Sequence, residues 1–127
     1  MPNASCARPA PAPFVGDAAG GPVPAAPALK VGLVLLDQFT LAAFAGLVDV
    51  LRLAGDHGGR SRQIHTAWRV MSVGGAPRRS SAGLSVTDVA DLIEPDAFDY
   101  VAVCGGNDYL NQNQAPELTD WLRPAAR

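Results

Sequence analysis

The sequence predicts an α/β fold in which a parallel β-sheet is flanked by helices. The run at residues 30–36 is continuously apolar after Lys30, and this run and the one at residues 100–104 are short and partly β-branched, which is typical of strands buried on both faces. Helical segments alternate with these strands, and that alternation favours a parallel sheet. Polar or glycine-rich turns follow the strands, at the edge where open parallel sheets bind ligands.

Composition narrows the class of protein. The 127 residues fit one domain, and 48% hydrophobic with 17% charged residues indicates a globular chain. A net charge of −2 gives no basic footprint for nucleic acid. The N-terminus lacks the basic and apolar regions of a signal peptide, and no apolar run reaches the roughly 20 residues of a membrane span. We therefore expect a cytoplasmic protein without membrane contact.

Two regions are predicted. Residues 1–28 hold most of the chain's 11 prolines, with many alanines and glycines, and are expected to form a disordered extension. Residues 29–127 are expected to form the ordered domain. Cys6 and Cys104 make no disulfide framework, which fits a reduced compartment.

The first strand is followed by a helix. Thr40 is placed to cap a helix over residues 41–54, and Gly55 is expected to end it in the left-handed conformation. Asp49 and Arg52 are three residues apart and are predicted to pair. The rest of this helix is so apolar that other elements of the domain, or a second subunit, must cover it.

The remaining elements complete a strand–helix–strand order. A polar loop over residues 55–65 precedes them, and the predicted segments are a strand at 67–73, a polar loop at 78–83, a short strand at 84–86, a brief helical turn from 87 or 88 to 93, a strand at 100–104 and a helix from about 116 to 122. No strand follows the last helix. The sheet is therefore expected to be incomplete at the C-terminus.

Three turns at strand ends supply the candidate ligand-binding residues, which are Asp37, Gly75, Gly105, Gly106 and Asn107. Gly105 and Gly106 allow a tight turn with positive φ and bare amides, which can hold a carboxylate, a phosphate or an oxyanion. The alternative is a plain turn between strand and helix. Asp37 either faces the same crevice or is a solvated turn residue.

No residue is assigned a catalytic role. Cys104 ends a strand, but a nucleophilic thiol needs a lowered pKa, and no histidine lies near it in sequence, so a buried strand cysteine is favoured. Residues 78–81 could meet an anion, with a solvated loop as the default. Trp68 and Trp121 are expected to be core or half-buried residues. Motifs for dinucleotides, phosphate loops, nucleophile elbows and zinc are missing, so no cofactor or metal is predicted.

Five stretches occur in an order that resembles ThiJ/PfpI-like (class I glutamine amidotransferase-like) domains: residues 31–41, 46–54, 70–75, 80–86 and 98–106. The greatest similarity is to the N-terminal, ligand-sensing domain of GlxA-type regulators of the AraC family. The resemblance covers about residues 29–127. It implies a flavodoxin-like parallel sheet and a homodimer in the full-length parent.

The resemblance also implies where chemistry would lie. Enzymes of this family place a cysteine on a strained turn after the next strand, beside an acidic residue of the first helix. Ala43 stands at that acidic position, and Cys104 precedes the Gly105–Gly106 turn instead of occupying the elbow. In the regulators a helix-turn-helix half follows this domain, and both features would lie beyond Arg127.

The resulting hypothesis is a non-catalytic sensory domain that binds a small metabolite between Asp37, Gly75 and Gly105–Gly106. DNA would be contacted by a C-terminal domain outside this chain. The alternative is a fragment of a ThiJ/PfpI-like cysteine-dependent enzyme, namely a hydrolase, hydratase or amidotransferase-like protein, and a third possibility is a non-functional remnant. The sequence leaves the ligand and the target genes open.

Overall fold

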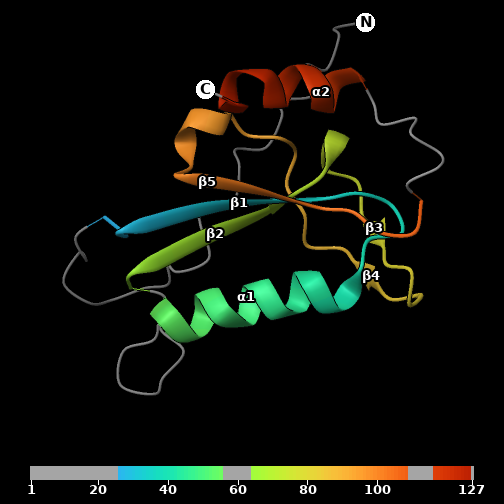
Figure 1. The fold of residues 1–127 in the computed structure, drawn as a ribbon, viewed down its shortest axis with the longest axis horizontal. Coiled ribbons are helices and arrows are strands. Elements are labelled where there is room, and N and C mark those ends of the chain that lie inside the picture. The colour runs from blue at the N-terminus through green and yellow to red at the C-terminus, as the bar shows by residue number, and fades with distance from the viewer. Residues whose placement is uncertain (1–25, 56–63, 109–115, 127) are drawn as a thin grey trace, which may run out of the picture.

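The computed structural model describes residues 26–55, 64–108 and 116–126. The predicted extension (except residues 26–28), Cys6 and most of the polar loop at 55–65 lie outside the described residues. The described part has three layers, with a central sheet between helix α1 (Leu41–Gly55) and helix α2 (Pro116–Leu122) (Figure 1). The predicted α/β fold with flanking helices is confirmed.

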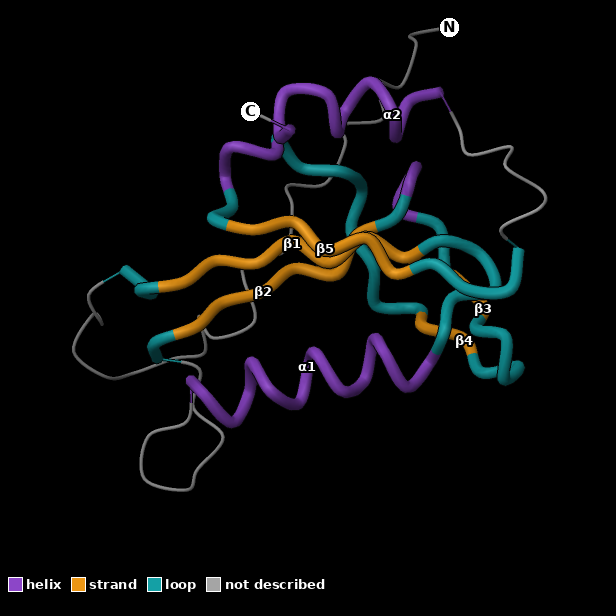
Figure 2. Tube along the Cα trace, viewed as in Figure 1, coloured by secondary structure: helices purple, strands orange, loops and turns teal. Residues whose placement is uncertain are grey.

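The central sheet is parallel, as predicted. Its strands are β1 (Leu29–Leu35), β2 (Thr66–Met71) and β5 (Tyr100–Cys104), and they lie in the order β2–β1–β5 (Figure 2). Leu33 of β1 is in register with Val70 on one side and Ala102 on the other. Because β1 is central and covered by helices on both faces, its sequence is a continuous apolar run.

Strand β2 ends two residues earlier than predicted. Ser72 is fully buried, and its hydroxyl donates a 2.6 Å hydrogen bond to the carbonyl of Ala76. This bond closes a turn that contains the 3₁₀ helix η1 (Val73–Gly75). The side chain of Ser72 thus competes with strand pairing and ends the strand.

A second, two-stranded sheet pairs β3 (Arg78–Arg79) with β4 (Ser85–Val86) in antiparallel fashion. The prediction of a polar loop from residue 78 is therefore wrong for its first two residues. Ser80 is buried and closes the connection, since its amide donates to the carbonyl of Leu84 at 2.8 Å and its hydroxyl accepts from the Leu84 amide at 3.1 Å.

The predicted helical turn between residues 87 and 93 is also wrong. Ala90 pairs with the outer side of β2, because its amide donates to the carbonyl of Val70 at 2.9 Å and its carbonyl accepts from Ser72 at 3.0 Å. The open hydrogen-bonding edge of β2 thus holds this segment extended. A 3₁₀ helix, η2, forms later at Pro95–Ala97.

Helix α1 covers one face of the sheet. Leu51 packs in a core cluster with Val31, Leu33 and Trp68. Gly55 ends the helix as predicted, but its φ is not positive, so the expected left-handed stop is wrong. A Cβ at Gly55 would collide with the side chain of Thr66, so close approach to β2 requires glycine here.

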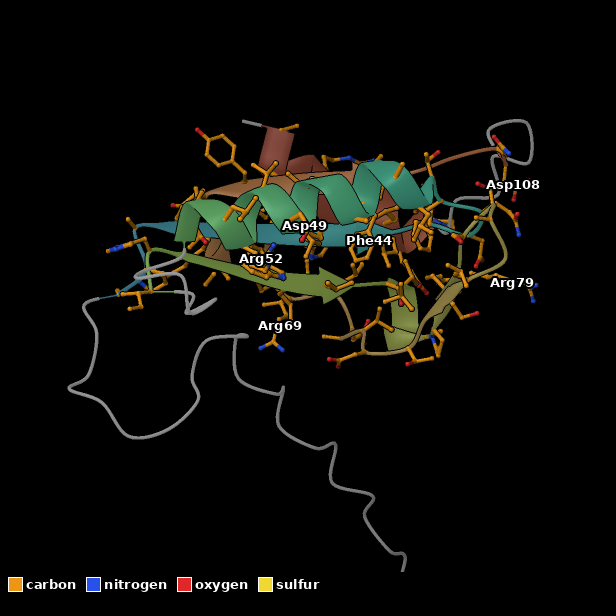
Figure 3. All side chains as sticks on the ribbon, turned by 90° about the horizontal axis from the view of Figure 1, so that it is seen from below. Phe44, Asp49, Arg52, Arg69, Arg79 and Asp108 are labelled. Atoms are coloured by element: carbon orange, nitrogen blue, oxygen red, sulfur yellow. The ribbon has the colours of Figure 1, made fainter. Side chains whose placement is uncertain are left out.

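The outer surface of α1 is not covered by any of the described residues. Val50 and Leu53 each expose 61% of their surface. Asp49 and Arg52 form the predicted pair on this helix, with a distance of 3.2 Å between Oδ1 and Nε (Figure 3). The predicted need for a cover over this helix is thus not met within the described part of the chain.

Helix α2 covers the other face. Leu118 is 1% exposed and packs with Val34, Met71 and Phe98. The indole Nε1 of Trp121 donates to the carbonyl of Ile93 at 2.7 Å, which fixes the helix to the connection before β5. After α2 the chain continues as the 3₁₀ helix η3 (Arg123–Ala126). None of the helices in the described ranges is long and apolar enough to cross a membrane.

Candidate functional site

The carboxyl ends of β1, β2 and β5 meet at one edge of the parallel sheet, which we call the carboxyl edge and define as residues 36–40, 72–80 and 104–108. Phe39 is its centre and is fully buried. It forms bridges to Ser80 and to Gly106, and its ring meets that of Phe44 edge to face at 5.6 Å between centroids. Sequence reasoning missed Phe39, although an aromatic residue directly after a polar turn signals an anchor.

Gly105, Gly106 and Asn107 pair with the turn after β1. The Thr40 amide donates to the carbonyl of Gly105 at 2.9 Å, and the Asn107 amide donates to the carbonyl of Gln38 at 3.2 Å. Neither Gly105 nor Gly106 has a positive φ, so the predicted conformation of this turn is wrong. Antiparallel pairing across the Phe39–Gly106 bridge keeps the segment extended instead.

Gly106 is required for a different reason. A Cβ at this position would collide with the carbonyl oxygen of Gln38. By contrast, a Cβ at Gly105 would meet only Leu36 Cδ1 within 4 Å, at 3.8 Å. Gly106 is therefore needed because the main chain of Gln38 comes so close to it. The Asn107 amide already donates to the Gln38 carbonyl.

Gln38 adopts the left-handed conformation, with φ of 58°. Its amide donates to the carbonyl of Arg79 at 2.8 Å, and its carbonyl accepts from Asn107. A non-glycine residue in this region stores on the order of 1 kcal/mol of strain, and such residues concentrate at functional sites. Through these two hydrogen bonds Gln38 connects strand β3 to the segment after β5, at a cost in backbone conformational energy.

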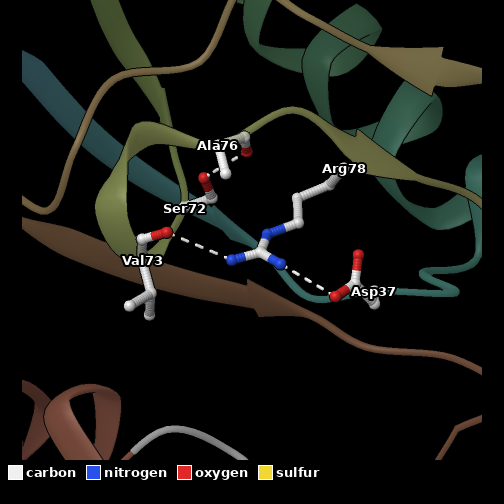
Figure 4. A network of polar contacts seen from close by, with 5 residues as sticks. All are labelled: Asp37, Ser72, Val73, Ala76 and Arg78. Carbon is white, nitrogen blue, oxygen red and sulfur yellow. Dashed lines mark hydrogen bonds and ion pairs between the residues drawn. The ribbon is translucent and has the colours of Figure 1, made fainter.

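Asp37 and Arg78 form an ion pair at this edge, with 2.8 Å between Oδ2 and Nη1. The Nη2 atom of Arg78 donates to the carbonyl of Val73 at 3.1 Å (Figure 4). Arg78 therefore does not lie in a solvated loop, and the default interpretation of residues 78–81 is wrong for it. Its side chain is held between the turn after β1 and the turn after β2.

Gly75 has φ of 65° and donates its amide to the carbonyl of Ser72 at 3.0 Å. A Cβ there would lie 3.1 Å from the amide nitrogen of Asp91. Asp91 also accepts a hydrogen bond from the Gly74 amide at 3.0 Å. Gly75 thus packs toward the segment before η2, and its turn is joined to Asp37 through the contact of Arg78 with Val73.

Cys104 is buried against Leu35 and Phe39. Burial raises the pKa of its thiol, which disfavours the reactive thiolate. This environment matches the buried strand cysteine that the sequence favours. Ala43 lies exposed on the first turn of α1, which has no acidic residue.

Three further features bear on the kind of site. Across the described ranges, no three His, Cys, Asp or Glu side chains gather closely enough to hold a metal ion. Trp68 is buried and Trp121 is half-buried, as predicted. Arg79 is exposed and points away from the fold, in contrast to its neighbour Arg78 (Figure 3).

Comparison with known proteins points to transcriptional regulators. The chain is 38% identical over 77 residues to the HTH-type transcriptional regulator GbdR of Pseudomonas aeruginosa strains UCBPP-PA14 and PAO1, a match that covers 61% of this chain and 20% of the relative. The crystal structure of an AraC family transcriptional regulator from Pseudomonas putida is similar with a TM-score of 0.59 and 29% identity, over 77% of this chain and 50% of that one. The chain matches no protein-family model.

These likenesses concern part of each relative. The chain spans about a fifth of the length of GbdR that it matches and half of the solved regulator. It is thus homologous to a helix-turn-helix-type regulator and similar in structure to a regulator of the AraC family. Its candidate ligand-binding residues lie at the carboxyl edge of its own parallel sheet.

Proposed function

We propose that this chain is the ligand-sensing, non-catalytic part of an AraC-type transcriptional regulator. The observation that carries the proposal is the likeness to the AraC family regulator from Pseudomonas putida, at 29% identity over 77% of this chain. The identity of 38% to GbdR over 77 residues supports it independently.

The site supports binding more than reaction. Asp37, Arg78 and the backbone around Gly106 supply charge and shape at the carboxyl edge, which is where open parallel sheets bind ligands. Cys104 has a raised pKa and is buried beneath Phe39, so it is a poor nucleophile. The ThiJ/PfpI-like resemblance is kept as a hypothesis about the fold family, and its cysteine-dependent enzymes as the rival function.

In the full-length parent, this part would bind a small metabolite in the cytoplasm and the parent would act as a homodimer. DNA would be bound by a region outside this chain, because the chain's net charge of −2 offers no basic surface. Ligand binding at the carboxyl edge would change the relative stability of two states of the parent and so its activity on DNA.

A thermal-shift screen of the purified chain against a panel of small metabolites tests the proposal. A true ligand stabilises the fold by about 2.7 kcal/mol at a hundred times its Kd, which raises the Tm in a dose-dependent way. The same compounds are incubated with the chain and followed by mass spectrometry. The proposal predicts a ligand that stays chemically unchanged, whereas turnover would favour the enzyme, and a panel without any stabilising compound would count against sensing.

A further inference from the structure

Arg78 differs from an ordinary surface arginine in how it is held. Its side chain exposes 19% of its surface, and its Nη2 atom donates to the main-chain carbonyl of Val73. That carbonyl belongs to the turn that the hydrogen bond between Ser72 and Ala76 closes, so the acceptor of Arg78 is itself held in place (Figure 4). The guanidinium therefore keeps its place at the carboxyl edge whichever anion it meets.

Its partner is held far less firmly. The side chain of Asp37 exposes 59% of its surface, against 19% for Arg78. Exposed carboxylates gain little from an ion pair, because water solvates them almost as well. In an exchange of partners, the arginine would stay in place and the aspartate would turn out to solvent.

Not every donor of Arg78 can take part in such an exchange. Its Nε is buried and has no hydrogen-bond partner among the described residues, so a ligand would meet Arg78 at its terminal Nη groups. A free carboxylate can approach a guanidinium with both oxygens, whereas Asp37 contacts Arg78 through one oxygen, Oδ2, at Nη1.

The backbone amides around Arg78 offer less to an anion. The amides of Gln38, Thr40 and Asn107 all donate to main-chain carbonyls at this edge. The side chain of Arg79 points away (Figure 3). Among the described residues of the carboxyl edge, Arg78 is therefore the cation that faces inward, and the group it already binds is a carboxylate.

We infer that Arg78 recognises a carboxylate group of the ligand, and that Asp37 is an internal counter-ion which the ligand displaces. This inference rests on the proposed sensing function and names the chemical class of its ligand. A single guanidinium matches the single charge of a carboxylate, and the position that the ligand takes is the one filled by the Asp37 carboxylate. The Asp37 carboxylate thus occupies the anion position beside Arg78 until a ligand carboxylate displaces it.

The test is a titration of the ¹⁵N-labelled chain with sodium acetate, followed by the Nε–H resonance of Arg78 in NMR spectra. The resonance is assigned by through-bond correlations and checked by its loss in Arg78→Lys. Sodium chloride at equal ionic strength and neutral acetamide are the reference titrants. Acetate alone should shift the resonance in a saturable way.

The variant Asp37→Asn separates competition from structure. Without the internal carboxylate, the acetate midpoint should fall by up to about fivefold, because an exposed ion pair is a weak competitor. Asp49→Asn is the matched control, because Asp49 also pairs with an arginine, Arg52, but on the outer surface of α1. It should leave the midpoint unchanged.

Two outcomes would overturn the inference. One is an acetate midpoint that is the same in wild type and Asp37→Asn, or no saturable shift in either, which would make the pair structural only. The other is saturation by inorganic phosphate at lower concentration than acetate in Asp37→Asn. Sensing itself can survive this failure, since a neutral ligand from the thermal-shift screen that binds Arg78→Lys as tightly as wild type would leave sensing intact and remove the carboxylate assignment.

Discussion

The carbonyl oxygen of Gln38 lies against the α-carbon of Gly106, so closely that no side chain can be added there. The same carbonyl accepts the amide of Asn107 at 3.2 Å. The turn after β1 and the turn after β5 are thereby joined through main-chain atoms. This contact fixes one side of the carboxyl edge and leaves the ion pair of Asp37 with Arg78 to hold the other.

Replacing Gly106 by alanine should destabilise the fold. The added methyl group meets backbone atoms of Gln38 and Phe39, which cannot move aside as a flexible side chain can. We expect a loss of about 1–3 kcal/mol in the free energy of unfolding, measured by urea denaturation. Gly105→Ala is the control and should stay within about 0.5 kcal/mol of wild type, because Leu36 Cδ1 is 3.8 Å away. Equal losses in the two variants would refute this role for Gly106.

Replacing Gly46 by alanine should have the opposite effect. Gly46 lies in the exposed middle of α1, and a Cβ there would meet nothing within 4 Å. Because alanine loses less backbone entropy in a helix, the gain should be about 0.5–1 kcal/mol in the same measurement. The reciprocal change, Ala45→Gly, should lose a similar amount. A destabilised Gly46→Ala chain would indicate that α1 is covered at this position.

The stability of the chain should fall at alkaline pH through Cys104. Burial raises the pKa of this thiol in the folded state, so the unfolded state loses the proton first as pH rises. The contribution is complete below the ordinary thiol pKa and is lost as pH rises through the folded pKa. The stability advantage of wild type over Cys104→Ala should therefore shrink between about pH 8 and pH 10. A constant difference across that range would show that the thiol is not buried.

The long elements follow from local pattern. The apolar run of β1 and the periodic residues of α1 are consequences of burial in a central strand and beneath a helix, so they are visible in sequence. The segment around Ala90 is not, because its extended form depends on a hydrogen bond that Ala90 donates to Val70 and one that it accepts from Ser72, residues on strand β2 and directly after it. Two-residue strands such as β3 carry no period to detect.

The candidate site was partly predictable for the same reason. The position of Asp37 after a strand places it at the carboxyl edge, and the glycines mark close turns. The ion pair of Arg78 was missed because it joins residues 41 apart in sequence. In addition, an arginine next to a second arginine and two serines is typical of a solvent-exposed loop. Only the folded chain turns Arg78 inward and Arg79 outward.

The most direct test of the account is to map the bound ligand on the chain. The compound that stabilises the chain most in the thermal-shift screen is titrated into ¹⁵N-labelled protein, and amide shifts are measured. The account predicts that the largest shifts lie at residues 37–39, 73–78 and 105–107. Shifts centred on Val50 and Leu53 of α1, or no shifts at all, would contradict the assignment of the carboxyl edge as the ligand site.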